Sequence, residues 1–458
     1  MSAASLIGGT RGYDGRLHKG GQRVDASGLE KLATAVPIGQ QHLPLRKVVA
    51  VGVGNALEFY DFLTFSFFAI QIGHCFFPQS QTSHGLLYSL ATFGVGFLTR
   101  PLGGVVIGRY GDRVGRKPAM VLSFALMGAC MLGLVLTPSY TQIGIAAPIL
   151  LVIFRLVQGF ALGGEVGPST AFLLEAAPPN RRGFYVSLQL MTQDVAVLAA
   201  GVAGFVLTSA LTPAALDAWG WRVAFLIGTA VVPIGLKMRR NLPETMDDAD
   251  RRRTAPEQRR LPVRLIVLAL MLMMAATIYL YGLDYITTYA QDGLHMTPAL
   301  AFGATVVIGL CAVIADPVSG LLSDRIGRRP VMLGAVVILV LLLVPAYMAM
   351  TELRSVSVVY SAIAILAVLQ AFLTTPALVT VTESLPKAVR SGALAMLYAL
   401  AISVFGGSTQ FVIKALSDLS GSPLAPAWYM TGAVLIGGIA MALMPETAPV
   451  KVGLAPGH

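Results

Sequence analysis

Charged side chains are scarce in this sequence. Asp, Glu, Lys and Arg make up 12% of its 458 residues, whereas 55% are hydrophobic, and the mean hydropathy is +0.72. An ordinary soluble domain carries about twice that share of charge, so the composition excludes one and indicates a chain that resides in lipid. Cysteine is scarce too: Cys75, Cys130 and Cys311 show no spacing of metal ligands or of a disulfide framework, and we expect them to be packing residues.

Other common signals are missing altogether. Residues 1–45 contain no apolar stretch that would serve as the core of a cleaved signal, so we expect a disordered cytoplasmic tail. The remainder lacks the alternating ten-residue segments of a transmembrane barrel, so its backbone polar groups must be satisfied within helices. No catalytic constellation, metal motif or large soluble segment stands out. We therefore expect neither an enzyme nor a protein with a cofactor.

Apolar runs long enough to cross a bilayer recur along the whole chain. A helix needs about 20 consecutive apolar residues to span the hydrocarbon core. We predict an all-α membrane protein with twelve transmembrane helices. They lie at residues 46–74, 85–109, 118–137, 148–174, 184–210, 221–237, 264–290, 299–321, 331–350, 356–381, 392–416 and 427–444.

Basic residues are distributed unevenly between the two sides of such a bundle. If the amino terminus is inside, 28 of the 33 Lys and Arg residues fall on cytoplasmic segments, while Arg100 and Arg155 lie within spans. The positive-inside rule therefore predicts that both termini face the cytoplasm. The net charge of +10 has the same origin, since basic loops face anionic lipid headgroups, and no nucleic-acid partner is needed to explain it.

The sequence contains two similar halves, because three segments recur in the same order about 200 to 210 positions later. They are GRYGDRVGRK (108–117) with GLLSDRIGRR (320–329), EAAPPNRRG (175–183) with ESLPKAVRSG (383–392), and LPET (242–245) with MPET (444–447). We predict two six-helix bundles, at 46–237 and 264–445, with a cytoplasmic linker at 238–263 and a cytoplasmic tail at 446–458. Parallel repeats of this kind rock about a site near the membrane midplane and give alternating access.

The repeated loop motif, GxxxDRxGRK, is similar to the signature of the major facilitator superfamily, with one copy between spans two and three and the other between spans eight and nine. Glycine permits tight turning, and an acid beside a helix start can cap backbone donors or pair with basic residues of neighbouring helices. The resemblance implies that these loops are gates; for their basic residues the alternative is a plain positive-inside turn. The residues concerned are Gly108, Asp112, Arg113, Gly115, Arg116, Gly320, Asp324, Arg325, Gly327 and Arg328.

Span four carries two charges in FRLVQGFALGGEVGPST, residues 154–170. An ionisable residue at bilayer depth costs about 2.5–3.5 kcal/mol on insertion scales and normally faces a bundle interior or a cavity. Arg155 and Glu165 lie ~15 Å apart along a helix and cannot pair with each other. The pattern RxxQGxxxGGE, which includes Gln158, resembles the span-four motif that accompanies proton coupling in the superfamily. For both Arg155 and Glu165, the alternative to a role in transport is a structural ion pair with a residue of another helix.

Span one contains GNALEFYDF, which places Glu58 and Asp61 three residues apart and therefore on one helical face. Two neighbouring carboxyl groups in a low dielectric disfavour the second ionisation, as a proton carrier requires. The alternative is that both acids pair with Arg100 or Arg155. An acid that protonation releases from an arginine would itself be a coupling switch.

Further polar groups lie in the second half. Asp284 lies in IYLYGLDYITTY, where Tyr281 and neighbouring tyrosines offer hydroxyl donors, so we predict a polar lining of span seven. The physical case for an anionic substrate depends on Arg155, whose guanidinium matches a carboxylate bidentately, and on Lys414 in span eleven.

GNALEFYDF, TRPLGGVVIGRYGDRVGRK and FRLVQGFALGGE together are similar to the metabolite/proton symporter family within the superfamily. GFYVSLQ, VFGGSTQ and the PAWYM stretch look most like its citrate and tricarballylate symporter branch. The resemblance implies proton-driven uptake of a small organic acid across the bacterial inner membrane, with protons as the coupling ion. We expect the protein to be a monomer.

Three acids depart from the pattern of that branch. Asp194 stands where the branch tends to have an amide, and Asp284 and Asp316 stand where it has apolar residues. Extra negative charge would repel a trianion unless these acids are protonated or paired, so a citrate-like tricarboxylate, a mono- or dicarboxylate and a zwitterion all stay open. We expect Asp316, close to a cytoplasmic loop, to be gating or structural. The alternative function on the same scaffold is proton-driven export of a drug or metabolite.

Overall fold

The structure is a computed structural model, and it describes residues 55–56, 59–77, 82–114, 116–163, 166–240, 261–387 and 389–452. The predicted tail at 1–45 lies outside these residues, as do residues 241–260 of the predicted linker and the last six positions. Most of the described positions are helical, and no strand occurs among them. Helices satisfy their own backbone hydrogen bonds, as lipid requires.

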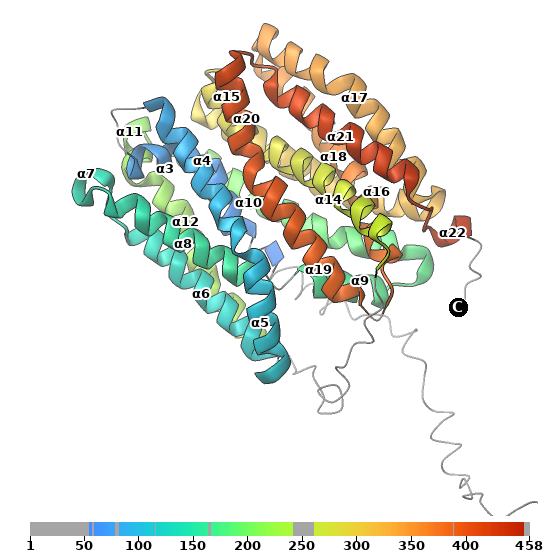
Figure 1. The fold of residues 1–458 in the computed structure, drawn as a ribbon. Helices are drawn as coiled ribbons and strands as arrows, with labels where there is room; N and C mark the ends of the chain where they lie inside the picture. Colours follow the sequence, from blue (N-terminus) through green and yellow to red (C-terminus); the bar gives the residue numbers. More distant parts are fainter. Residues whose placement is uncertain are drawn as a thin grey trace, which may run out of the picture. The chain divides into compact units, whose positions relative to one another are not determined.

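Helices occupy all six apolar runs predicted for the first half, residues 55–240, which we call the N-half (Figure 1). A helical segment at 59–67 leads into α3 (Ala69–Phe76). The elements that follow are α4 (Thr82–Leu98), α5 (Arg100–Val114), α6 (Arg116–Leu136), α7 (Tyr140–Ile143), α8 (Ala146–Leu162), α9 (Val166–Ala176), η3 (Pro179–Arg181), α10 (Arg182–Ala210), α11 (Pro213–Ala215), η4 (Leu216–Gly220) and α12 (Trp221–Arg240).

The second half, residues 261–452, which we call the C-half, repeats this pattern. Its elements are α14 (Val263–Asp284), α15 (Ile286–Asp292), α16 (Pro298–Ile326), α17 (Arg328–Leu353), α18 (Val356–Ser384), α19 (Arg390–Ala401), η5 (Ile402–Gly406), α20 (Gly407–Ser420), α21 (Ala425–Leu443) and α22 (Pro449–Val452). Eight helical segments of the described chain are long and apolar enough to cross a bilayer, and two shorter apolar helices accompany them in the N-half. All twelve predicted spans therefore correspond to helices.

The helix ends define two faces, which we name for the sequence motif. The motif face contains the ends of helices at Arg182, Ile326 and Ser384, and the far face contains those at Ala210, Pro298 and Ser420. The positive-inside argument predicts that the motif face is cytoplasmic.

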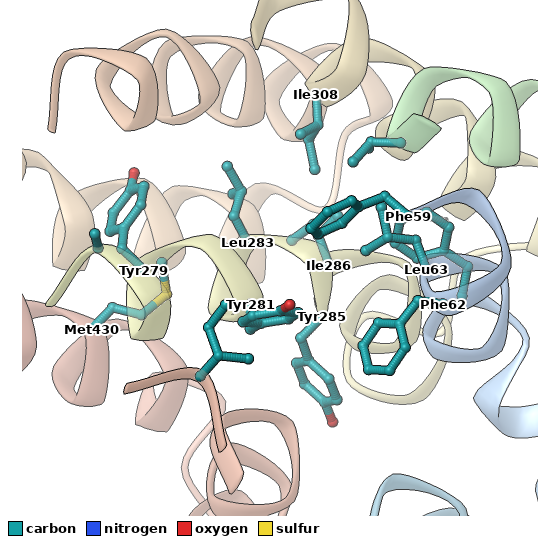
Figure 2. Close-up of a cluster of buried hydrophobic side chains, with 14 of the residues drawn as sticks. Phe59, Phe62, Leu63, Tyr279, Tyr281, Leu283, Tyr285, Ile286, Ile308 and Met430 are labelled. Carbon is teal, nitrogen blue, oxygen red and sulfur yellow. The ribbon is translucent and has the colours of Figure 1, made fainter. Parts of the chain in front are cut away.

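One hydrophobic core contains side chains from both halves. Figure 2 shows part of it: Phe62 and Leu63 come from the first span, and Tyr281 and Ile286 come from the seventh. The rings of Phe68 and Phe302, one from each half, lie with centroids 4.7 Å apart. The described conformation therefore has the two halves in direct contact.

The longest contact between the halves is made by α10 and α16, which pack side by side. Near the motif face, a Cβ on Gly320 would lie 2.7 Å from the carbonyl oxygen of Gly183, a distance that real Cβ atoms do not show. Near the far face, a Cβ on Gly201 would lie 3.0 Å from the backbone nitrogen of Val306, which is tighter than most real Cβ contacts. Small residues at both ends thus let the two backbones meet.

Candidate functional site

A buried arginine on α8 is at the centre of the candidate site. Arg155 is fully buried, and its guanidinium carbon lies 4.4 Å from the ring centroid of Phe62 and 4.3 Å from that of Phe65. Phe93 presents a third ring at 5.5 Å. Cation–π attraction to these faces offsets part of the cost of burying the charge. The rings also keep water away from the guanidinium.

Gln158 links this arginine to Asp61 of the first span. Arg155 Nη1 donates to Gln158 Oε1 over 2.8 Å, and Gln158 Nε2 donates to Asp61 Oδ2 over 2.9 Å. All three side chains are fully buried. Asp61 Oδ1 and the Nε and Nη2 atoms of Arg155 have no hydrogen-bond partner among the described residues. The network therefore retains one acceptor and two donor groups for a ligand or a proton.

A second arginine, Arg100, lies against the same cluster. Its guanidinium carbon is 4.7 Å from the centroid of Phe62, so this ring contacts both arginines. Arg100 also packs on Phe97, whose ring centroid lies 5.4 Å from that of Tyr281 of α14, and it acts electrostatically on the Tyr281 hydroxyl. Tyr281 is 1% exposed, and it brings the C-half into the cluster. With Asp61 ionised, these two arginines and one carboxylate carry a net charge of +1.

A hydrogen-bonded amide joins spans one and eleven beside Tyr281. Ser66 Oγ donates to Gln410 Oε1 over 2.9 Å, and Gln410 Nε2 lies 3.4 Å from the carbonyl oxygen of Tyr281. Ser66 and Gln410 are both buried. This contact joins the halves next to Tyr281, and a second buried contact, from Ser403 Oγ to the carbonyl oxygen of Phe97 over 2.7 Å, joins them beside Arg100.

Lys414 lies apart from the arginine cluster, whereas Asp284 acts electrostatically on Tyr281 of that cluster. Lys414 Nζ is 2.9 Å from Asp292 and 2.6 Å from Asp418, and the three residues line a cavity of about 400 Å³ at the far face, within the C-half. Asp284 is buried and interacts electrostatically with Asp194 of α10. The structure thus does not bring Lys414 together with Arg155.

The described copy of the loop motif forms a contact between the halves at the motif face. Asp324 accepts from the backbone N–H groups of Gly183 (2.8 Å) and Phe184 (2.9 Å), which open the first turn of α10. The same carboxylate lies 2.7 Å from Arg328, whose side chain is fully buried. Arg328 also pairs with Glu383 over 3.3 Å. Arg325 of the same motif is exposed.

Glu446 caps the first turn of α17 beside this contact. Its carboxylate accepts from the backbone N–H groups of Arg328 (2.9 Å) and Arg329 (3.0 Å). Burial raises the pKa of Glu446, but these donors and two from Thr447 and Ala448 outweigh it and hold that pKa below the usual glutamate value. Gly327, at φ +110°, is the link between α16 and α17, and a Cβ there would meet the same carboxylate.

Comparison with known proteins agrees with this geometry. The family model described as the Major Facilitator Superfamily matches residues 59–406 and 288–457. The chain belongs to the major facilitator superfamily. It is 34% identical to the citrate-proton symporter of Klebsiella pneumoniae over 89% of this chain and 93% of that protein. It is 33% identical to the proline/betaine transporter of Escherichia coli K12 over 89% of this chain and 85% of that protein.

Solved structures show the same fold. A crystal structure of a D-xylose-proton symporter superposes with a TM-score of 0.70 at 17% sequence identity, over 87% of this chain and 98% of that one. The protein is therefore a multi-pass membrane transporter of the major facilitator type and not an enzyme. The predicted resemblance to the citrate symporters is confirmed at the level of sequence similarity.

Several predicted site residues of this transporter lie outside the described residues. They are Glu58, Glu165 and Gly115. Gly108, Asp112, Arg113 and Arg116 lie in described helices, but the surroundings of their side chains are not described. The first copy of the loop motif thus stays a sequence prediction, as do the roles of Glu58 and Glu165.

The sequence interpretation did not single out two residues of the arginine cluster. Arg100 carried a signal, because it is an arginine within an apolar run, and it was considered only as a partner for the acids of span one. Gln410 is the last residue of VFGGSTQ, which was quoted only for the resemblance to the citrate branch and without a role for the glutamine. Only the contact between spans one, seven and eleven reveals it.

Proposed function

We propose that the protein is a proton-coupled symporter that moves a small carboxylate-bearing solute across the bacterial inner membrane by alternating access. The observation that carries this proposal is the buried Arg155–Gln158–Asp61 network with its unpartnered guanidinium nitrogens and its unpartnered carboxylate oxygen. The description of one relative as a citrate-proton symporter supports it.

Arg155 is suited to bind the carboxylate. A guanidinium offers parallel N–H donors that match the two oxygens of a carboxylate, and such pairs are stronger where water is excluded. Arg155 uses Nη1 for Gln158 and keeps Nε and Nη2 without partners. The phenylalanine rings that pack against it fix its position, so that little side-chain freedom remains to be lost when a ligand binds.

Asp61 is suited to carry the proton. An ionised Asp61 competes with the substrate for Arg155 through Gln158, whereas a protonated Asp61 leaves the guanidinium to the substrate. Proton binding and anion binding therefore favour each other within one cluster. Coupling also removes the electrical barrier, since an inside-negative potential opposes entry of each negative charge by ~2.3 kcal/mol per 100 mV.

The chemistry of the substrate can be narrowed to solutes with a carboxylate. Citrate bears three such groups, and proline and betaine each bear one together with a cationic nitrogen. Relatives named for these solutes are similarly close to this chain. We propose an organic acid as the first candidate, because the arginine cluster has a net positive charge. A zwitterion is the second candidate, because Asp284 and Asp194 place buried carboxyl groups in the adjoining helices.

The test is uptake into proteoliposomes with an inward proton gradient. We expect Arg155→Ala to abolish uptake, and Arg155→Lys to lower it by about tenfold or more, because lysine cannot bind bidentately. Arg222→Lys is the matched control: Arg222 also packs on an aromatic ring, at 4.4 Å from Trp221, but its donors bind backbone carbonyls of Val135 and Thr137. Its uptake should stay within about twofold of wild type.

The substrate should be identified first. A panel of tri-, di- and monocarboxylates and of zwitterions, tested for thermal stabilisation of the purified protein, would select it, because a bound ligand raises the unfolding temperature. Normal uptake by a correctly inserted Arg155→Ala protein would refute the role of Arg155. Efflux of the same solute from loaded vesicles, with no gradient-driven uptake, would favour the exporter instead.

A further inference from the structure

Two aspartates from different halves meet within the α10–α16 contact. Asp194 lies twelve residues after the start of α10, and Asp316 lies ten residues before the end of α16. At a rise of 1.5 Å per residue both lie ~15–18 Å from the motif face, close to the middle of a bilayer core. Asp316 is therefore deeper than its expected place beside a cytoplasmic loop.

Gly183 of α10 lies against Gly320 of α16, and Leu198 lies against Gly309, so this antiparallel register places Asp194 within about one helical turn of Asp316. The two carboxyl groups act on each other electrostatically and through a side-chain hydrogen bond. Asp194 is 4% exposed and Asp316 is 1% exposed. The Thr375 hydroxyl of α18 donates to Asp316 Oδ1 over 3.2 Å, whereas the buried Oδ2 atom of Asp316 has no N–H or O–H donor among the described residues. Ionised carboxylates only accept hydrogen bonds, so this pair can form one only if it holds a proton.

The surroundings of the pair supply no compensating positive charge. A further acid lies nearby on α14, because the Asp194 carboxyl acts electrostatically on Asp284. Among the described residues, the Thr375 hydroxyl of α18 is the one further polar group that acts on Asp316. Within the described chain, no Lys, Arg or His side chain acts on either carboxyl. The missing partner of Asp316 is therefore a proton rather than a basic side chain.

We propose that Asp194 and Asp316 share one proton, and that this carboxyl–carboxylate hydrogen bond is a second proton site that joins the N-half to the C-half. This inference rests on the proposed function only in one respect, which is that the two halves move relative to each other. It differs from the Asp61 site, because it lies between the halves and involves no arginine. Loss of the proton would leave two negative charges facing each other where water is excluded.

This site makes the α10–α16 contact dependent on pH. If one proton is bound only while the helices are joined, the ratio of joined to parted protein falls by up to about tenfold for each unit of rising pH. The joined state is thus favoured at low pH and the parted state at high pH. Binding of the proton and joining of the two halves are therefore coupled equilibria.

Infrared difference spectroscopy of a pH titration tests whether the proton exists. We expect a carbonyl band of a protonated carboxylic acid that disappears in Asp194→Asn and in Asp316→Asn. The band should persist in Asp61→Asn and in Asp284→Asn, which remove the neighbouring carboxyls and leave the pair intact. A band that persists in both pair variants, or one that is lost in Asp284→Asn, would overturn the proposal.

Distances between spin labels test whether the proton joins the helices. Val202 of α10 and Leu310 of α16 are exposed and suit the labels, with the native cysteines replaced. In wild type the short-distance population should fall as pH rises. Asp194→Asn should keep it at all pH values, because an asparagine amide donates to Asp316 without needing a proton. Wild-type pH dependence in Asp194→Asn would overturn the proposal.

The same measurement in Asp61→Asn separates this inference from the proposed function. We expect Asp61→Asn to keep the pH dependence of the distance even where it loses gradient-driven uptake. If Arg155 variants transport normally but the distance still depends on Asp194, the proposed function fails and this inference stands. A pH dependence that vanishes in Asp61→Asn would assign the proton to Asp61 and refute the second site.

Discussion

Asp324 offers a direct way to weaken the contact between the halves at the motif face. Its carboxylate accepts two N–H groups from the first turn of α10 and pairs with the buried Arg328 over 2.7 Å. Asp324→Asn keeps the size of the side chain but removes its charge. Because α10 and Asp324 belong to different halves, the two N–H bonds are interactions that hold this face closed, whereas the pair with Arg328 lies within the C-half.

The structure sets the size of the effect. The pair of Asp324 with Arg328 lies within the C-half and does not by itself distinguish closed from open protein. The two N–H groups of α10 are the donors that cross between the halves, and a hydrogen bond to a charged group contributes about 1.5–3 kcal/mol. A combined loss of about 3 kcal/mol corresponds to a roughly 150-fold change in the ratio of closed to open protein. Arg325→Gln is the matched control in the same motif, because Arg325 is exposed and surface substitutions change stability by less than about 0.5 kcal/mol.

The assay is the rate at which a water-soluble maleimide alkylates a cysteine placed at Ser187. Ser187 is fully buried on α10, where a Cβ on Gly320 of α16 would touch it. We expect alkylation to be strongly accelerated by Asp324→Asn and changed by no more than about twofold by Arg325→Gln. Equal rates in Asp324→Asn and wild type would refute the view that this carboxylate holds the motif face closed.

Two further predictions concern stability. Gly159→Ala places a methyl group against the carbonyl oxygen of Gly96 and should destabilise the protein by about 1–3 kcal/mol, measured by thermal unfolding; Gly432→Ala, with no atom within 4 Å of its added carbon, should not. Glu446→Gln weakens the cap of α17 and should lower the unfolding temperature at neutral pH. Because the pKa of Glu446 is depressed in the folded protein, its stabilisation is present above the ordinary value of about 4.3 and is lost as pH falls. The difference between Glu446→Gln and wild type should therefore vanish in acid, and a difference that grows in acid would contradict the cap.

The positions of the membrane spans could be predicted from sequence, because a bilayer requires long apolar helical segments. An apolar run of the required length has to be helical in a bilayer, so composition and run length were sufficient to predict α16, α17 and α18. The close helix packing at the glycines of span four also agrees with their small size. A methyl group on Gly159 or on Gly163 would collide with the backbone of the neighbouring span two. In both cases the residues of one short segment are sufficient to predict its structure.

The partners of the buried charges could not be predicted in the same way. Arg155 was expected to find its partner on another helix, but the intervening Gln158 became apparent only from the packing of α8 against the first span. The pairing of Asp194 with Asp316 depends on the register in which α10 crosses α16, and nothing in either segment fixes that register alone. The partners of Lys414 depend less on packing between the halves. Asp418 lies one turn further along the same helix, and Asp292 lies at the end of α15 in the same half.

The most direct test of proton coupling compares two fluxes of one labelled substrate in Asp61→Asn proteoliposomes. Counterflow exchanges labelled for unlabelled substrate and needs no net proton movement, whereas accumulation against a concentration gradient needs the proton. The network through Gln158 predicts that Asp61→Asn retains counterflow and loses accumulation driven by an inward proton gradient. Accumulation at the wild-type level in Asp61→Asn would contradict the account.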